Sequence, residues 1–287
     1  MPGYFFANLL WFVGVYYTFN SEGIINQVLF RGRGIQVYFS GRKCPCCFFI
    51  AGYHTKNFNC IILMFKKLFQ RIKFKLMAKQ LRRPSGTMGS KIGNMMNKAN
   101  EFLYDFTLDV MQLSVNESIL EIGFGNGKFF SKIFSKAEGL KITGLDFSET
   151  MYKTAKENNK VNIDNSRLSL HFGNSGAMPF PENSFEKIFC INVIYFWDEP
   201  QPHLLEIYRV LKPGGRFYAT VRTKESMLKM PFTKYSFTYY ETERWKKQLA
   251  DAGLTFIEER PFDEPIIDFD GEKLLVQSLS VIAEKKN

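Results

Sequence analysis

Apolar residues recur in two different rhythms between residues 91 and 283. Runs of consecutive apolar residues predict buried strands, and apolar positions spaced by three and four residues predict helices. The helical pattern covers residues 91–111, 128–136, 148–158, 204–211 and 241–252. The strand pattern covers residues 119–122, 141–146, 168–172, a run that ends near Cys190, and residues 216–221, 254–259 and 274–283. Strands that alternate with helices in this way predict an α/β protein built on a mostly parallel sheet.

The first 76 residues follow neither rhythm clearly. Residues 4–19 form an apolar run interrupted by Asn8, which is shorter than the ~20 residues that a membrane-spanning helix usually needs. No basic residue precedes this run and no small-residue cleavage site follows it, so a secretory signal is a poor match. Residues 66–76 are basic and amphipathic enough to lie on an anionic membrane surface.

Three interpretations of this segment remain open. It is a genuine membrane-associating extension, an irregular segment packed on the main domain, or the product of a misplaced start, with the natural chain beginning at Met77. We favour the misplaced start, because the sequence from Met77 onward reads like a natural amino terminus. We therefore expect an extension over residues 1–76 and a folded domain over residues 77–287. The expected location is the cytoplasm, with membrane attachment through residues 1–76 as the alternative.

The net charge of +10 suggests a nucleic-acid or membrane partner, but the charge is unevenly distributed. Residues 1–76 hold 10 Lys and Arg residues against a single acid, Glu22. Residues 77–287 hold 28 basic and 27 acidic residues, which leaves them nearly neutral. The basic balance of the chain therefore gives no argument for a nucleic-acid partner, and we expect none.

Cysteine usage separates the same two regions. Cys190 is the one cysteine after Met77, and its place in an apolar strand suits a small buried side chain. A lone thiol in the main body fits a reducing compartment and excludes a disulfide scaffold. The other four cysteines precede Met77 without the paired spacing of a zinc site, and His54 stands alone near them, so we predict no metal centre. They are Cys44, Cys46, Cys47 and Cys60.

The most specific chemical signal is a glycine-rich turn after the first strand of the domain. Glu121 precedes the turn, and glycines occupy positions 123, 125 and 127. Glycines let the backbone bend sharply and approach a ligand closely at the start of a helix. Asp146 ends the next strand, where a carboxylate can accept hydrogen bonds from a ribose diol. Together these residues predict a nucleoside-type cofactor across the carboxyl ends of two parallel strands.

The glycine spacing separates two classes of nucleotide-binding protein. A dinucleotide fingerprint needs its third glycine at position 128, where this chain has Lys128. The third glycine comes one residue earlier, and this pattern resembles motif I of the class I S-adenosylmethionine (SAM)-dependent methyltransferases. The segments 178–186 (MPFPENSFE) and 206–215 (EIYRVLKPGG) are also similar to the small-molecule methyltransferases of type 11. Two positions depart from the usual pattern: Asn174 and Glu186 stand where the group usually has Asp.

The resemblance covers roughly residues 110–285 and implies a fold, a cofactor and a set of contacts. The fold is a Rossmann-like, doubly wound sheet of seven strands with helices on both faces, in which the last strand is antiparallel and lies between the fifth and sixth. The cofactor is SAM. By resemblance, Glu121 and the backbone of Gly123, Gly125 and Gly127 hold its methionine part, and Asp146 holds the ribose. Asn174 and Ser175 hold the adenine, although an Asn in the segment Gly173–Gly176 is as readily explained as a turn residue. The backbone near Asn192 meets the methionine amine.

The acceptor side is much less defined. Tyr195 follows the fourth strand and faces the donor methyl group in this fold, while His171 and His203 are candidate bases because imidazoles titrate near neutrality. Each of the three is equally well explained as a structural residue. The loop 224–240 is rich in Met and aromatic residues, and we expect it to form one wall of an apolar acceptor pocket. The predicted function is methyl transfer to a small molecule. The alternatives are a nicotinamide-dependent oxidoreductase, or a SAM-binding scaffold without catalysis.

Overall fold

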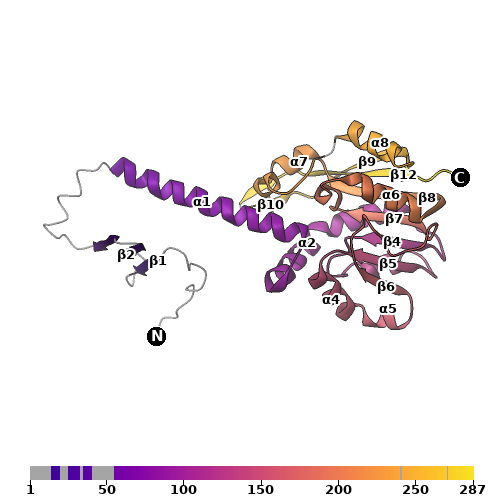
Figure 1. Cartoon of the computed structure of the whole chain (residues 1–287), viewed down its shortest axis with the longest axis horizontal. Helices are drawn as coiled ribbons and strands as arrows, with labels where there is room; N and C mark the ends of the chain where they lie inside the picture. Colours follow the sequence, from indigo (N-terminus) through magenta and orange to yellow (C-terminus); the bar gives the residue numbers. More distant parts are fainter. Residues whose placement is uncertain (1–13, 20–24, 33–34, 41–54, 240, 270) are drawn as a thin grey trace. The chain divides into compact units, whose positions relative to one another are not determined.

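A computed structural model describes residues 14–19, 25–32, 35–40, 55–239, 241–269 and 271–287 of the chain (Figure 1). The chain divides into two compact units, residues 1–67 and residues 68–287. Three of the cysteines considered above and His54 lie outside the described residues: Cys44, Cys46 and Cys47.

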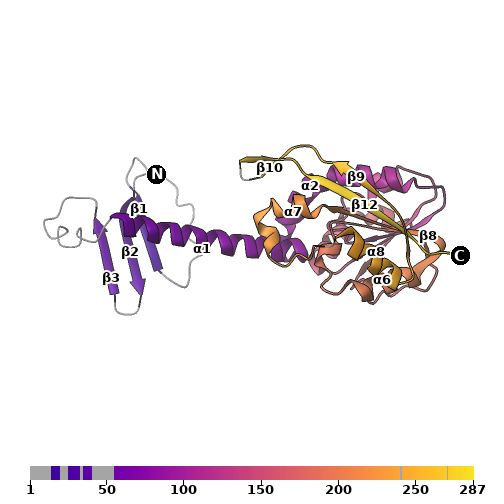
Figure 2. The ribbon, with the colours of Figure 1, turned by 90° about the horizontal axis from the view of Figure 1, so that it is seen from above.

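The first unit contains a three-stranded antiparallel sheet, drawn in Figure 2. Its strands are β1 (Gly14–Phe19), β2 (Ile25–Gly32) and β3 (Ile35–Ser40). The sequence rhythm did not predict β2 and β3, because hydrogen bonds between the strands can hold a sheet whose side-chain alternation is weak. In the described part of the chain, no helix has both the length and the apolar character that crossing a bilayer requires.

Helix α1 (Thr55–Arg82) begins in the first unit and continues into the second. The expected boundary at Met77 lies inside this helix, whereas the compact units meet between Lys67 and Leu68. Ala78 is fully buried, and the partly buried Phe74 and Met77 pack against Met230, Phe232 and Val276. The second unit therefore includes at least two turns of helix before Arg82.

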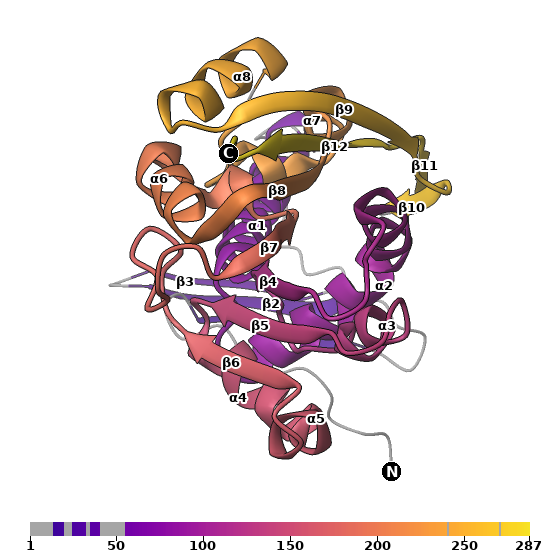
Figure 3. The same cartoon turned by 90° about the vertical axis from the view of Figure 1, so that its right-hand side faces the viewer.

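The second unit is built on a seven-stranded sheet of order β6-β5-β4-β7-β8-β12-β9 (Figure 3). The strands are β4 (Ser118–Ile122), β5 (Lys141–Asp146), β6 (Leu168–Phe172), β7 (Phe185–Ile191), β8 (Leu211–Arg222), β9 (Thr255–Asp263) and β12 (Gln277–Glu284). The first five are parallel to their neighbours, while β12 pairs antiparallel with both β8 and β9. This confirms the predicted fold class, including the antiparallel last strand between the fifth and the sixth.

Helices cover both faces of this sheet, as predicted, because successive side chains of each strand point to opposite faces. Leu120 of β4 packs in a core with α6 (Pro200–Val210) and α8 (Thr242–Asp251). Its neighbour Ile119 packs in the other core, with α2 (Gly86–Met111), α3 (Phe130–Phe134) and α4 (Glu149–Asn158). Ser148 caps α4 as predicted, since its hydroxyl accepts a hydrogen bond from the Met151 N–H at 3.2 Å.

The remaining elements are short. They are α5 (Lys160–Asp164), α7 (Lys224–Leu228), the 3₁₀ helices η2 (Ile194–Phe196) and η3 (Pro231–Lys234), and the hairpin of β10 (Ile267–Phe269) and β11 (Glu272–Leu274). The predicted helix over 128–136 is reduced to α3, and the predicted strand over 216–221 lengthens at both ends into β8. Pairing with β12 covers residues 216–222, and pairing of Leu211 with Phe185 of β7 extends the strand at its other end.

Candidate functional site

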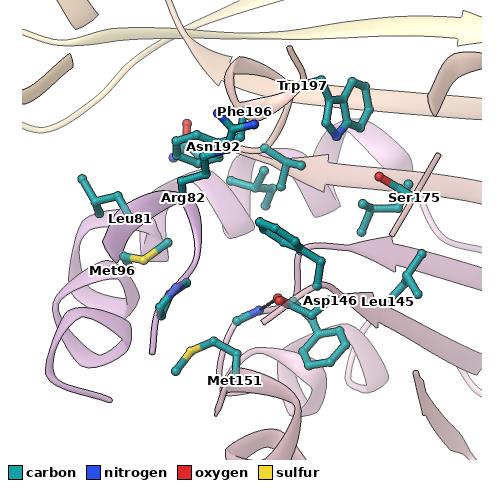
Figure 4. Close-up of a pocket in the computed structure, with 18 of the residues that line it drawn as sticks. Leu81, Arg82, Met96, Leu145, Asp146, Met151, Ser175, Asn192, Phe196 and Trp197 are labelled. Atoms are coloured by element: carbon teal, nitrogen blue, oxygen red, sulfur yellow. Dashed lines mark hydrogen bonds between the residues drawn. The ribbon is translucent and has the colours of Figure 1, made fainter. Parts of the chain in front are cut away.

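A cavity of about 460 Å³ opens at the carboxyl ends of β4, β5 and β7 (Figure 4). Its floor contains Ile122, Leu145 and Ile191, the residues at or next to these strand ends. The last residues of α1 and one side of α2 supply the opposite wall. Parallel α/β sheets bind ligands at this edge, next to the point where the strand order reverses. Here that point lies beside β4, which pairs with both β5 and β7.

The glycines of the turn after β4 are required for different reasons. Gly123 and Gly127 have φ angles of +80° and +70°, and a Cβ would lie 2.5 Å from Val193 Cγ2 at the first and 2.8 Å from Ala155 Cβ at the second. A Cβ at Gly125 would meet nothing within 4 Å. Gly123 and Gly127 therefore permit close packing of the turn, while Gly125 leaves open space along the cavity wall that it lines.

The carboxylate of Asp146 stabilises the conformation of this turn. Its carboxylate accepts hydrogen bonds from the Gly125 N–H at 2.9 Å and from the Ser148 N–H at 2.8 Å. The side chain is 8% exposed and lines the cavity. Burial raises the pKa of Asp146 to about 6, and the two backbone N–H groups oppose that rise. The carboxylate is therefore mostly ionised at neutral pH and retains lone pairs for a ligand.

Glu121 lies outside the cavity lining, one layer behind it. The hydroxyl of Tyr104, on α2, donates a hydrogen bond to its carboxyl group, and Tyr104 itself lines the cavity. Burial raises the pKa of Glu121 to about 8, which the bond from Tyr104 opposes. Tyr104 also stacks on Phe129, with ring centroids 3.9 Å apart. Glu121 is therefore largely protonated at neutral pH and positions a wall residue of the cavity.

The loop after β6 forms the end of the cavity near Ser175 and Trp197. Asn174 Oδ1 accepts a hydrogen bond from the Gly176 N–H at 3.0 Å, which is the turn role, and its side chain also lines the cavity. Ser175 Oγ lies 2.7 Å from Nδ1 of His203, whose ring stacks on Trp197 with centroids 4.5 Å apart. Burial lowers the pKa of His203 to about 4, so the imidazole is neutral at physiological pH.

Asn192 joins the loop after β7 to helix α2. It has a left-handed φ of +58°, and its Nδ2 donates to Asn100 Oδ1 at 3.0 Å. Its Oδ1 accepts from the Tyr195 hydroxyl, which in turn accepts from the Arg222 N–H at 3.2 Å. Asn100 and Asn192 line the cavity, whereas Tyr195 is buried behind them. Burial raises the pKa of Tyr195, so its hydroxyl stays protonated.

Several residues considered for the acceptor side lie away from the cavity. His171 contacts Ser169 Oγ at 2.9 Å on β6, and neither it nor Tyr195 lines the cavity, whereas His203 does. The loop 224–240 does not form a wall here either: Phe237 lies behind Phe196, with centroids 4.8 Å apart. The loop therefore supports a wall residue instead of contacting a ligand in this cavity.

The sequence reasoning missed the contributions of α1 and of the asparagines in the first half of α2. Arg82 and Asp198 both line the cavity, and Arg82 donates two hydrogen bonds to the Asp198 carboxylate, one of them 3.0 Å long. From α2, the asparagines at positions 94, 97 and 100 recur at a spacing of three, a polar stripe that could have indicated a functional face. Asn97 and Asn100 line the cavity, while Asn94 Oδ1 accepts from Asn126 of the glycine turn at 3.4 Å. Within the described ranges, no group of three His, Cys, Asp or Glu residues could hold a metal ion.

A seven-stranded sheet of this order, with a cavity above a glycine turn and a strand-end acid, defines a nucleotide-binding α/β protein. Comparison with known proteins narrows the class. The family described as "Methyltransferase domain" matches residues 120–219. The uncharacterised methyltransferase YdaC of Bacillus subtilis (strain 168) is 28% identical over 134 residues, which are 47% of this chain and 72% of YdaC.

Two further proteins extend the comparison. The demethylmenaquinone methyltransferase of Listeria welshimeri is 33% identical over 112 residues, which cover 38% of this chain and 47% of that enzyme. A proposed methyltransferase, solved in complex with the Trm112 methyltransferase activator of Haloferax volcanii, has the same fold, with a TM-score of 0.58 and 21% identity. That alignment covers 68% of this chain and 94% of the other. The family match and the methyltransferase relatives support a class I SAM-dependent methyltransferase, and the solved structure shares the fold of this chain.

Proposed function

We propose that the cavity binds SAM and that the protein transfers the methyl group of SAM to a small-molecule acceptor. The observation that carries this proposal is the position of the Asp146 carboxylate. It is buried in the cavity wall, held by two backbone N–H groups, and still has acceptor capacity toward the cavity. A ribose diol offers two O–H donors to such a carboxylate.

The adenine and the methionine part of SAM are assigned to opposite ends of the cavity. The adenine lies at the end lined by Asn174 and Ser175, beside the flat face of Trp197. The methionine part lies over Gly123 and Gly125, toward Asn192. In this proposal Glu121 acts indirectly, by orienting Tyr104, because its raised pKa leaves it largely uncharged at neutral pH.

Methyl transfer from a sulfonium is an in-line displacement, so the protein mainly has to align the donor and the acceptor. We propose that the acceptor enters beside Leu81, Met96 and Phe196, which supply apolar surface near Arg82 and Asn192 (Figure 4). Of the two histidines considered as bases, His203 lies in the cavity wall, and its low pKa makes it a weak base. Alignment of an already nucleophilic acceptor therefore supplies most of the catalysis.

We also propose that residues 77–287 contain all of the catalytic machinery, with residues 1–76 as an extension, and that the enzyme works in the cytoplasm. The cavity-lining residues support the first point, since all of them lie between Leu81 and His203. A nicotinamide-dependent oxidoreductase is not supported, because the relatives described above are methyltransferases.

Calorimetric titration of the full chain with SAM and, separately, with NADH tests the cofactor. We expect micromolar binding of SAM and none of NADH, and the opposite result refutes the proposal. Release of S-adenosylhomocysteine in a screen of small-molecule acceptors then tests catalysis. SAM binding without turnover on any acceptor of the screen favours the scaffold over the enzyme.

A further inference from the structure

Helix α1 carries a second apolar face that the described part of residues 68–287 leaves exposed. Its inner face, with Phe74, Met77 and Leu81, packs against the cluster of Met230, Phe232 and Val276. Four large apolar side chains on the same helix remain between 46% and 53% exposed, which is unusual for residues of this type in one stretch. They are Leu68, Phe69, Ile72 and Leu76.

Helical geometry places these four residues on one side. At about 100° per residue they fall within an arc of roughly 100°, centred about 180° from the arc of the packed residues. The exposed stripe is therefore continuous along the helix and points away from the methyltransferase body. Three other large apolar residues are also exposed. Leu228 ends α7, and Ile266 and Leu275 flank the β10–β11 hairpin.

Basic side chains border the stripe on both sides. Arg71 and Lys75 lie along one edge and Lys73 lies along the other, while Lys79 follows Leu76 on the side of the stripe itself, and all four are exposed. No acidic residue occurs anywhere between Glu22 and Glu101, so nothing within α1 neutralises these charges. Lys75 additionally lies over the ring of Tyr235, at 5.7 Å from its centroid.

We propose that the outer face of α1, Leu68 to Lys79, docks on an anionic lipid bilayer. An apolar stripe edged by Lys and Arg matches the two layers of such a surface, because the apolar side chains enter the acyl boundary while the cations meet the lipid phosphates. A nucleic acid satisfies the charges but offers nothing to cover Phe69 and Ile72. Helix α1 lies flat on the surface and does not cross the bilayer. Its last residues, Leu81 and Arg82, line the cavity, so the docked face and the active site share one helix.

Co-sedimentation of the full chain with vesicles tests this proposal. We expect binding to phosphatidylcholine vesicles that contain phosphatidylglycerol, little binding to pure phosphatidylcholine, and a decrease as salt screens the charges. The variant R71Q/K73Q/K79Q loses three cations, each worth roughly a factor of five, so its partition falls about a hundredfold. The variant F69S/I72S loses roughly a factor of ten for each side chain.

Matched variants elsewhere on the surface serve as controls. K136Q/K153Q/K160Q removes the same charge from exposed positions outside α1, and V161S removes an apolar side chain that is 72% exposed. Both controls should partition like the wild type, and thermal unfolding should be unchanged in every variant because all the substituted side chains are at the surface.

Four outcomes overturn the proposal. They are wild-type protein that ignores anionic vesicles, patch variants that bind as well as the controls, binding to RNA in place of vesicles, and a dimer that F69S/I72S dissociates without any vesicle binding. The third assigns the basic face to nucleic acid, and the fourth assigns the apolar stripe to a second copy of the chain. SAM affinity is measured in parallel, so failure of the membrane proposal stays distinct from failure of the cofactor proposal.

Discussion

Replacement of Asp146 by Asn separates cofactor binding from folding. The carboxylate accepts from the N–H groups of Gly125 and Ser148, and an amide can accept only one of those bonds while its NH₂ group faces the other. The unsatisfied donor costs about 1–3 kcal/mol. The substitution also removes a buried charge whose pKa is raised to about 6, a relief of about 3 kcal/mol at neutral pH. We therefore expect the stability of D146N to lie within about 2 kcal/mol of the wild type.

The affinity of D146N for SAM should change much more than its free energy of unfolding. The ribose loses its bonds to a charged acceptor, which lowers SAM affinity by about 2–4 kcal/mol, or roughly 30- to 1000-fold. The wild type should also bind SAM more weakly as pH falls through about 6, because protonation of Asp146 removes the charged acceptor. D146N should show no such pH dependence between pH 7 and 5.

Isothermal titration with SAM, together with thermal unfolding at each pH, measures both quantities. Asp109→Asn is the matched control, since Asp109 is exposed on α2 and pairs with Lys136 away from the cavity. If D146N binds SAM as tightly as the wild type and as D109N, then Asp146 does not hold the ribose. The proposed orientation of the cofactor is then refuted.

Three further predictions concern stability. Gly123→Ala should lower the free energy of unfolding by about 2–4 kcal/mol and weaken SAM binding, because the new Cβ meets Val193 at a positive φ. Gly271→Ala is the control: its φ is similar, at +85°, but no atom lies within 4 Å of the new Cβ, so it should cost only about 1 kcal/mol. Glu121→Gln should raise stability at pH 6 by about 2 kcal/mol, because the unfolded chain must take up a proton at Glu121 on folding and Gln needs none. It should also abolish the loss of stability that the wild type shows as pH rises from about 4.5 to about 8, where the native protein holds this proton and the unfolded chain does not. A fragment of residues 77–287 should fold and bind SAM with a lower Tm, because it lacks Phe74 of the packed face of α1.

For each of these three predictions, one result would contradict the reasoning. Equal losses in G123A and G271A show that backbone strain, and not the contact with Val193, explains the requirement for glycine. A wild-type stability profile that stays flat from about pH 5 to about pH 8, and matches that of E121Q, shows that the Glu121 carboxyl is not held protonated. Failure of fragment 77–287 to bind SAM, while fragment 68–287 binds it, shows that the catalytic unit includes the preceding turns of α1.

Much of the fold could be predicted because its signals are local. Most strands of the main sheet contain a short apolar run, and the glycines at 123, 125 and 127 follow the first of these runs directly. The carboxyl ends of neighbouring parallel strands meet at one edge, so the placement of Asp146 beside the turn follows from chain order and fold class. The resemblance to a known family supplied the position of β12, which periodicity alone could not give.

The opposite wall of the cavity could not be predicted in this way. Asn192 meets Asn100 across 92 positions of the chain, and Asp198 meets Arg82 across 116. Nothing in the local sequence of either partner signals the other. The same limit applies to Tyr104, which was one of several aromatic residues on a predicted helix until the fold placed its hydroxyl against Glu121.

The sequence by itself therefore indicated the class of the protein, the cofactor that we propose and the residues at the floor of the cavity, because strand periodicity, turn glycines and strand-end acids are encoded by neighbouring residues. Only the tertiary structure decided which residues close the cavity, which acid faces it and which lies behind it, and which face of α1 remains uncovered. These properties depend on packing between segments that are far apart in the chain, and on the burial that raises the pKa of Glu121 and lowers that of His203.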